Sequence, residues 1–539
     1  MNVYPLEQRT IGNILADKVA RIPEQIFLLW EDRSFTYADI DAMTNRYANG
    51  FLENGVRKGD HVAVLMSNCP EFFGVIWGLG KIGAVAVPIN TAAKGEMLRY
   101  FIDQSDSTFV VIDSDSCQRV KEVSISIPKV QAYFFHSPDS KNGNNFDIPN
   151  SKIINFDVLE NAKNSRPSLD IVRFDDIHLI MYTSGTTGPS KGVMSPHSQG
   201  HAVGMSVARS YGYRSDDVLF TCLPLFHGNA LWYTCYAALW SDAAIALVPR
   251  FSASNFWEDI RRMGATQFNS LGAMTNIIWK IPPSPQDSNH KLRQCMTVPV
   301  PREIYSEMQE RYHLTLTSVY AMTENFAVTL FTPDDPIEKV GSAGKSRGEA
   351  LLKIVDDERQ SIGVNEVGEI CVKPTSEGLM MKGYYKMPEA TAREFHEGWF
   401  YTGDRGYLDA DGYLFFVDRK KESIRRRGEN ISAYEVELII SRHPSILEVA
   451  AVPVSSELSE DDVMVYVVLK PGETLTHSEV VHFAAENMSY FMVPRFVEFI
   501  EELPKTPSEK LEKYKLKKSA EERREQLWDR EQEGIQIKR

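Results

Sequence analysis

TSGTTGPSKG, at residues 183–192, is the most informative segment of this chain. It follows directly on IHLIMY (residues 177–182), a short apolar run typical of a buried strand. Glycine, serine and threonine offer backbone N–H groups and hydroxyls that can wrap around a polyphosphate, and Lys191 adds positive charge. A P-loop of the form G-x-x-x-x-G-K-[S/T] is excluded, because that pattern fails at Ser190 and Gly192. We therefore expect a phosphate-binding loop, with a flexible polar turn as the alternative.

Short apolar runs rich in β-branched residues alternate with helical segments along most of the chain. Residues 61–65, 108–112 and 244–248 are expected to be strands, and residues 70–81 and 253–263 helices. This alternation predicts an α/β fold with largely parallel sheets. Because 539 residues exceed the usual length of one domain, we expect a large N-terminal α/β domain built of several subdomains, followed by a second domain.

The character of the sequence changes near residue 418. A short charged stretch, residues 418–422, follows the apolar residues 413–417, as a linker would. The N-terminal domain is therefore placed at residues 1–418, and a small α+β domain at residues 419–539.

Two capping boxes mark helices in the smaller domain. Ser432 with Glu435, and Thr476 with Glu479, have the spacing at which the two side chains cap a helix N-terminus reciprocally. The tail at residues 517–533 is densely charged with both signs, and we expect it to be a solvated helix supported by i,i+4 ion pairs.

The overall composition excludes several classes of protein. A formal charge of −14 argues against a general nucleic-acid binder, and an anionic substrate would need local basic groups. The six cysteines form no C-x-x-C pair, which favours reduced thiols over a zinc site or a disulfide framework. With no signal-peptide pattern and no apolar run of membrane-spanning length, we expect a cytoplasmic protein without a membrane partner.

Five segments, in order along nearly the whole chain, resemble motifs of the adenylate-forming superfamily. They are residues 183–192, YAMTE (320–324), YTGD (401–404), residues 419–428 and PKTPSEK (504–510). The superfamily includes acyl-CoA synthetases, luciferases and carrier-loading adenylation domains. The resemblance implies a ligase that uses ATP, Mg²⁺ and coenzyme A to convert a small carboxylic acid into an acyl-CoA through an acyl-adenylate. It also implies a mobile C-terminal domain, and it leaves a homo-oligomer open.

The resemblance assigns roles in adenylation. The residues expected to contact ATP are Thr183, Ser184, Gly185, Thr186, Thr187, Gly188, Lys191, Tyr320, Thr323, Asp404, Arg419 and Lys510. The expected catalytic residues are Lys510, Glu324, His227 and Thr186. Glu324 would be the Mg²⁺ ligand, and Asp404 would accept hydrogen bonds from the ribose hydroxyls. Each also has a structural interpretation: Glu324 could begin a helix, Asp404 could close a turn, and Lys510 lies in a lysine-rich run.

The resemblance also assigns residues to the acid and to coenzyme A. The residues expected around the acid are His227, Gly228, Trp232, Tyr233, Leu271 and Met322, and those expected near coenzyme A are Gly428, Glu429 and Asn430, with Lys421 as the hinge. The segments at residues 68–72, 417–419 and 427–432 most resemble the crotonobetaine/carnitine–CoA ligase branch. An aromatic wall could shorten the pocket and hold a trimethylammonium group, or both rings could simply pack in the core.

Three positions depart from the superfamily pattern. Glu509 precedes the predicted catalytic lysine where glycine is usual, Asp418 precedes the hinge arginine in the same way, and residues 297–299 replace Gly-Ala-Pro beside the adenine. Two alternatives therefore stay open. One is an adenylate-forming ligase with another acceptor, as an amide synthetase or a carrier-loading enzyme; the other is a nucleotide-binding protein without turnover.

Overall fold

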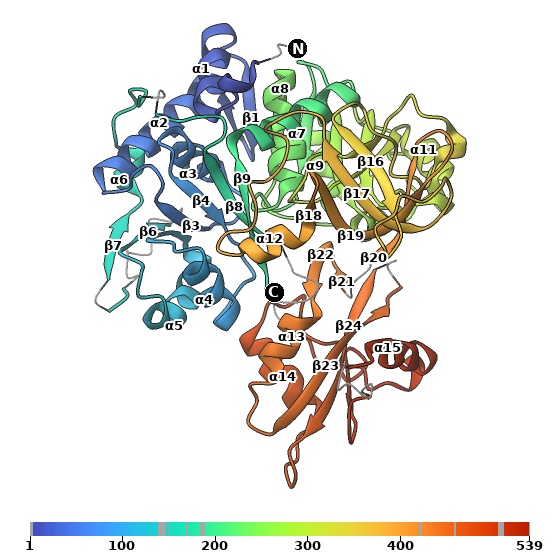
Figure 1. Cartoon of the computed structure of the whole chain (residues 1–539). Coiled ribbons are helices and arrows are strands. Elements are labelled where there is room, and N and C mark those ends of the chain that lie inside the picture. Colours follow the sequence, from blue (N-terminus) through green and yellow to red (C-terminus); the bar gives the residue numbers. More distant parts are fainter. Residues whose placement is uncertain are drawn as a thin grey trace.

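The computed structural model describes residues 4–137, 147–149, 151–168, 171–183, 189–419, 423–457, 460–504 and 511–537. A large N-terminal body and a smaller C-terminal body join along one side (Figure 1). The large body holds two mainly parallel sheets and one antiparallel sheet, with helices against the parallel sheets. The predicted α/β fold with a small second domain is confirmed. Among the described residues, no helix has the length and apolar character needed to span a bilayer.

A seven-stranded sheet carries both ends of the predicted phosphate loop. Its strand order is β7-β6-β5-β3-β4-β8-β9, and every pair is parallel except β8–β9. The strands are β3 (His61–Leu65), β4 (Val85–Pro88), β5 (Phe109–Asp113), β6 (Ala132–His136), β7 (Lys152–Asn155), β8 (Ile177–Thr183) and β9 (Lys191–Pro196). The helices of this part are α2 (Tyr37–Glu53), α3 (Pro70–Lys81), α4 (Gly95–Gln104), α5 (Cys117–Val123) and α6 (Asp157–Glu160). Because Thr183 pairs with Lys191, the two ends of the loop lie side by side.

An eight-stranded sheet forms the second half of the large body, in the order β15-β14-β13-β12-β10-β11-β1-β2 with antiparallel pairs only at its two edges. The strands are β1 (Ile26–Trp30), β2 (Arg33–Thr36), β10 (Val218–Thr221), β11 (Ala244–Leu247), β12 (Gln267–Leu271), β13 (Gln294–Val298), β14 (Thr315–Tyr320) and β15 (Thr329–Phe331). The helices are α1 (Ile11–Arg21), α7 (His197–Ser210), the π-helix η4 (Asn229–Tyr236), α8 (Ala237–Ser241), α9 (Phe256–Met263), α10 (Gly272–Trp279) and α11 (Tyr305–Tyr312).

An antiparallel sheet completes the large body, and two small sheets build the C-terminal body. The antiparallel sheet holds β16 (Ala350–Val355), β17 (Gly368–Pro374), β18 (Phe395–His396), β19 (Trp399–Leu408) and β20 (Leu414–Arg419), with α12 (Pro388–Glu394) beside it. The C-terminal body contains the hairpin β21 (Ser423–Arg426) and β22 (Glu429–Ser432), the sheet β23 (Ile446–Ser455), β24 (Asp461–Leu469) and β25 (Phe496–Phe499), and helices α13 (Ala433–Ile440), α14 (His477–Asn487) and α15 (Lys513–Glu522). Its apolar core is separate from that of the large body.

Most predicted elements agree with the structure to within a few residues. The predicted strand at 61–65 and helix at 70–81 match β3 and α3, while the predicted helix at 253–263 begins three residues later, at Phe256. The reciprocal capping box of Thr476 with Glu479 is confirmed at α14. Local periodicity was sufficient at these places because the buried faces are continuous in sequence.

Two expectations for the small domain are wrong. Ser432 caps α13 by accepting from the Glu435 N–H, but the Glu435 carboxylate contacts Ser190 of the large body instead of returning to the cap. The charged tail is not a single solvated helix, since α15 ends at Glu522 and Asp529 is buried. Asp529 is held there by an ion pair of 2.8 Å with Arg495.

Three histidines are buried between α7 and β8. The rings of His178 and His197 stack with centroids 4.3 Å apart, and the ring of His201 lies against Tyr236. Burial lowers the pKa of all three imidazoles, and it lowers that of His178 to about 4. These side chains are therefore neutral in the folded protein near neutral pH.

We expect the large body to lose stability as the pH falls through this window. An unfolded chain protonates these histidines below about pH 6.5, whereas folded His178 stays neutral down to about pH 4. Because the unfolded state then binds more protons, His178 alone costs up to about 3 kcal/mol of unfolding free energy between those limits. The urea concentration at the midpoint of unfolding, followed by tryptophan fluorescence, should fall as the pH is lowered. In the His178→Gln variant this midpoint should depend less on pH. His482→Gln, at an exposed position, should leave it unchanged.

Candidate active site

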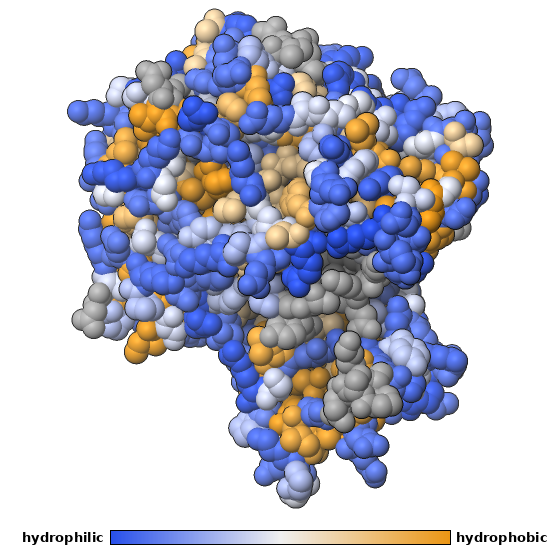
Figure 2. All heavy atoms as spheres, viewed as in Figure 1, coloured by the Kyte–Doolittle hydropathy of each residue, from blue (hydrophilic) through white to orange (hydrophobic). Residues whose placement is uncertain are grey.

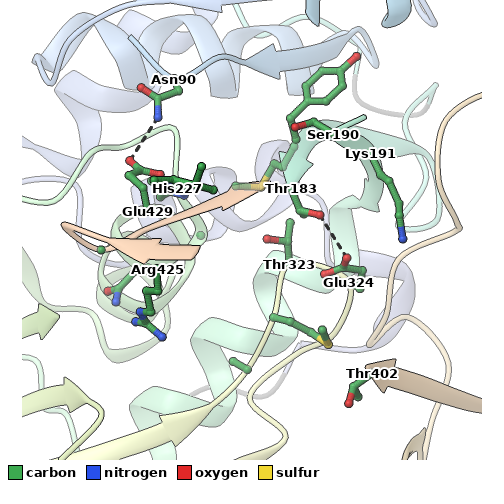
Figure 3. Close-up of a pocket in the computed structure, with 18 of the residues that line it drawn as sticks. Asn90, Thr183, Ser190, Lys191, His227, Thr323, Glu324, Thr402, Arg425 and Glu429 are labelled. Carbon is green, nitrogen blue, oxygen red and sulfur yellow. Dashed lines mark hydrogen bonds and ion pairs between the residues drawn. The ribbon is translucent and has the colours of Figure 1, made fainter. Parts of the chain in front are cut away.

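A cavity of about 640 Å³ lies where the two bodies meet. Its wall combines the C-terminal ends of strands from both parallel sheets, the segment around η4, strand β19 and the hairpin β21–β22. Figure 3 shows that side chains from these separate elements point toward the same space. The C-terminal ends of parallel strands are where α/β proteins place ligands.

A chain of polar groups lies at the phosphate-loop end of the cavity. Glu324 is buried, and its Oε1 accepts from the Tyr384 hydroxyl at 2.9 Å. The same oxygen accepts from Thr183 Oγ1 at 3.4 Å (Figure 3). Burial raises the pKa of the Glu324 carboxyl, because a charged group loses its hydration there. In the described part of the chain, no lysine, arginine or histidine forms an ion pair with it. Carboxylate and hydroxyl oxygens are ligands that Mg²⁺ prefers, so Glu324 and Thr183 fit a magnesium site.

Lys191 lies beside these polar groups, next to Tyr384 and Glu394. Its Nζ contacts Glu394 Oε1 at 2.5 Å and lies 4.4 Å from the centre of the Tyr384 ring. The Tyr384 hydroxyl is also 2.6 Å from Glu394 Oε2. The Lys191 ammonium is thus beside the cavity and paired with a carboxylate.

A carboxylate and two hydroxyls lie on the β19 side of the cavity. Asp404 is buried on β19 and accepts from the Tyr320 hydroxyl at 2.8 Å. Thr402, on the same strand, donates to the Ile370 carbonyl. Asp404, Val319 and residues 321–324 line the cavity, whereas Tyr320 does not. Stacking of Tyr320 on adenine stays a prediction.

The hairpin of the small domain reaches into the cavity and contacts the large body. Glu429 Oε2 lies 2.9 Å from His227 Nε2, and Asn90 Nδ2 donates to Glu429 Oε1 at 3.2 Å (Figure 3). Burial by itself would lower the pKa of His227, but the Glu429 carboxylate outweighs this effect and raises it. The imidazole therefore keeps its proton to a higher pH while the small domain is docked.

Gly428 of the hairpin lies close to Leu271 of the large body. Its φ is +80°, and a Cβ atom there would lie 2.3 Å from Leu271 Cδ1. No side chain fits this position without displacing Leu271. The structure therefore places residues 428 and 429 inside the cavity, next to the predicted acid-binding residues.

Glu435 joins the small domain to Ser190, near the end of the predicted phosphate loop. Its Oε1 accepts from the Ser190 backbone N–H at 2.8 Å and from Ser190 Oγ at 2.5 Å. Arg442 adds an ion pair of 3.0 Å with Glu96 of α4. A carboxylate thus occupies donors of the predicted phosphate loop in this arrangement of the two domains.

Outside this junction, the visible face of both bodies is mostly hydrophilic, with smaller hydrophobic areas (Figure 2).

The apolar end of the cavity is aromatic. Trp232 and Tyr233, from η4, are both buried and both line the cavity, so they pack in the core and also face the pocket. Gly228 lies against the face of Trp232, because a Cβ atom there would approach the ring at 3.1 Å. Asn269 donates to Asn229 and so ties β12 to the start of η4. The other apolar lining residues include Phe226, Leu271, Met296, Val298 and Met322.

Several predicted residues cannot be compared with the structure. Ser184, Gly185, Thr186, Thr187, Gly188, Lys421, Glu509 and Lys510 lie outside the described residues, and so do the side chains of Arg419 and Asn430. Sequence reasoning also missed Asn90, Tyr384, Glu394 and Glu435. Only the Gly383-Tyr384-Tyr385 run before a helix-starting proline, Pro388, could have drawn attention to Tyr384.

Comparison with known proteins identifies the class. Residues 15–385 match the family described as AMP-binding enzyme, and residues 435–510 match the AMP-binding enzyme C-terminal domain. The chain therefore belongs to the AMP-binding enzyme family, the adenylate-forming superfamily that its motifs resemble, and it is an AMP-forming acyl-CoA synthetase of that superfamily.

Individual relatives cover nearly the whole chain. It is 32% identical to the crotonobetaine/carnitine–CoA ligase of Salmonella agona over 516 residues, or 94% of this chain and 97% of that protein. Among solved structures, a double mutant of the o-succinylbenzoate CoA synthetase of Bacillus subtilis, with a product analogue bound, has a TM-score of 0.81 at 26% identity and covers 94% of this chain and 98% of its own. A fatty acyl CoA synthetase of Mycobacterium tuberculosis has a TM-score of 0.68 at 28% identity, with coverage of 95% and 98%.

Proposed function

We propose that this enzyme joins a carboxylic acid to coenzyme A at the expense of ATP, through an acyl-adenylate. One observation carries the proposal: the ends of the phosphate loop, Glu324, Asp404, an aromatic pocket and the hairpin at residues 428–429 converge on one cavity. The two half-reactions need these groups in one place, because the acyl group stays bound while its partner changes from AMP to the thiol of coenzyme A.

In the first half-reaction the acid carboxylate attacks the α-phosphorus of ATP, and pyrophosphate leaves. The loop at 183–191 holds the phosphates through its N–H groups, hydroxyls and Lys191, and Asp404 accepts from the ribose hydroxyls. Mg²⁺ held by Glu324 and Thr183 would neutralise phosphate charge. Lys510 adds a cation between the carboxylate and the α-phosphate, where negative charge develops.

In the second half-reaction the thiol of coenzyme A loses its proton and attacks the acyl carbonyl. A C–S bond forms, the C–O bond to phosphate breaks, and AMP leaves. The small domain, residues 419–539, pivots on Lys421 relative to residues 1–418. The arrangement seen in the structure suits this step, since Gly428 and Glu429 are in the cavity and Glu435 occupies the donors of Ser190. The likeness to a synthetase solved with a product analogue supports this assignment.

We expect Glu324→Gln to raise the magnesium concentration needed for half-maximal activity by about tenfold or more. The amide keeps the shape of the side chain but loses the charge that attracts a divalent cation. The measurement is a magnesium titration of AMP release at fixed ATP, with the exposed Glu338→Gln as control. An unchanged magnesium requirement would make Glu324 a structural residue.

The acid is proposed to be compact and to carry a quaternary ammonium, as carnitine-like acids do. The Trp232 ring faces an apolar pocket, where cation–π attraction to a trimethylammonium group is worth about 1–2 kcal/mol. The named activity of the relative from Salmonella agona supports the same class. The alternative substrates are short- and medium-chain acids that carry no quaternary ammonium group.

We expect crotonobetaine to exceed its neutral tert-butyl isostere by about tenfold in kcat/KM, and both to exceed a medium-chain fatty acid. Trp232→Leu should remove most of the preference for the charged head. Trp279→Leu, outside the cavity, serves as the control. If the fatty acid is best and the charge gives no advantage, a general medium-chain ligase remains. Replacing coenzyme A by an amine or a carrier protein in the same assay tests the acceptor.

A further inference from the structure

Four side chains form a continuous polar chain beside the cavity. Lys191 pairs with Glu394 Oε1 at 2.5 Å; Glu394 Oε2 lies 2.6 Å from the Tyr384 hydroxyl; and that hydroxyl lies 2.9 Å from Glu324 Oε1. The two carboxylates come from α12 and from the turn after β14, so they are brought together only by the fold. Glu394 itself has no part in the mechanism above.

The two carboxylates of this chain are not equivalent. A phenol has one proton, so the Tyr384 hydroxyl donates to only one of them at a time. Both oxygens of Glu394 have short contacts, one to an ammonium and one to the phenol. Glu324 has the longer phenol contact and a contact of 3.4 Å with Thr183. Lys191 thus forms its ion pair with Glu394, and the Glu324 carboxyl is left for another cation.

The Lys191 ammonium is close enough to pair with either Glu394 or Glu324. Its ammonium lies over the Tyr384 ring, 4.4 Å from the centroid, and the hydroxyl of that ring contacts Glu324. Because the two carboxylate oxygens share contacts of 2.6 and 2.9 Å with one hydroxyl, they are no more than 5.5 Å apart. A lysine side chain has four flexible methylene groups and can move its ammonium over such a distance. An ammonium on Glu324 would stand where a divalent cation has to bind.

We propose that Glu394 is a positioning residue that keeps the Lys191 ammonium away from Glu324 and thereby preserves the divalent-cation site. The inference rests on the proposed role of Glu324 as the metal ligand. Tyr384 separates the two carboxylates and orients both. When the phosphates of a nucleotide arrive, Lys191 exchanges Glu394 for phosphate without passing through the metal position.

The test measures binding of Mn²⁺ to the full-length protein without nucleotide, so that Lys191 has only carboxylates to pair with, by the electron paramagnetic resonance signal of free Mn²⁺. We expect Glu394→Gln to weaken Mn²⁺ binding by about tenfold, because Lys191 then pairs with Glu324. Glu394→Asp should retain most of the affinity. Glu389→Gln, on the exposed face of the same helix, is the matched control and should bind Mn²⁺ like the wild type.

A double-mutant cycle separates this account from a direct role of Glu394 as a second attractor of the metal. With Lys191→Met as the background, Glu394→Gln should have no further effect on Mn²⁺ affinity, since no ammonium is left to misplace. A loss of the same size in that background would overturn the inference, and so would wild-type affinity in the Glu394→Gln single variant. Glu324→Gln tests the underlying site. If this variant still binds Mn²⁺ like the wild type, the proposed metal role of Glu324 fails. If Glu324→Gln loses Mn²⁺ binding but Glu394→Gln binds Mn²⁺ normally, only the present inference fails.

Discussion

Lys510→Ala is expected to lower the rate of acyl-adenylate formation about a hundredfold or more, as the loss of one preorganised donor to a developing charge does. Thioester formation from supplied acyl-adenylate and coenzyme A should stay near the wild-type rate. The reason is that the hairpin at 428–429 occupies the cavity in the second half-reaction, when the Lys510 segment is expected to be elsewhere.

Two assays separate the half-reactions. Acid-dependent exchange of pyrophosphate into ATP reports the first, and consumption of prepared acyl-adenylate by coenzyme A reports the second. Lys515→Ala is a suitable control, because Lys515 is an exposed lysine of the same run that pairs with Glu512. An equal loss in both half-reactions would contradict the exchange of the two segments. Absence of exchange in the wild type with every acid would instead favour a nucleotide-binding protein without turnover.

The parts of the fold that the sequence predicts well are those with continuous buried runs. Strand β3 and helix α3 are buried along nearly their whole length, so their apolar patterns are complete within a few residues. Part of the cavity lining was also predictable, because Glu324 follows β14 and His227 follows β10 of the eight-stranded, mainly parallel sheet. Ligand-binding residues gather at that edge of a parallel sheet for topological reasons.

The partners of those residues were not predictable, because they come from distant parts of the chain. Glu435 has the spacing of a capping box, yet its carboxylate pairs with Ser190, 245 residues away. Similarly, the charges of the tail suggested exposure, but Asp529 is buried against Arg495. A local pattern gives the type of side chain and its element, whereas a charge is satisfied by whichever partner the fold brings close. Glu394 carries no periodic or motif signal, and the only local signal for Tyr384 is the Gly383-Tyr384-Tyr385 run before Pro388.

Gly428→Ala is expected to reduce thioester formation about a hundredfold or more while adenylation stays within a few-fold of the wild type. The added Cβ would lie 2.3 Å from Leu271 Cδ1, so the hairpin cannot dock in the arrangement seen here without moving that side chain. The positive φ of +80° adds about 1–2 kcal/mol of backbone strain for alanine. In the adenylation arrangement the hairpin is expected to lie away from Leu271, which removes the clash.

Gly472→Ala is the matched control for this variant, because Gly472 has a φ of +83° and no heavy atom within 4 Å of a built Cβ. It carries the same backbone strain in the same domain without the clash, so it should lower stability slightly and leave both half-reactions unchanged. Leu271→Ala added to Gly428→Ala makes room for the new methyl group and should restore part of the thioester rate. If the control loses as much thioester activity as Gly428→Ala, or if the second substitution restores nothing, backbone strain rather than docking of the hairpin explains the defect, and the arrangement in this structure is not the one that transfers the acyl group to coenzyme A.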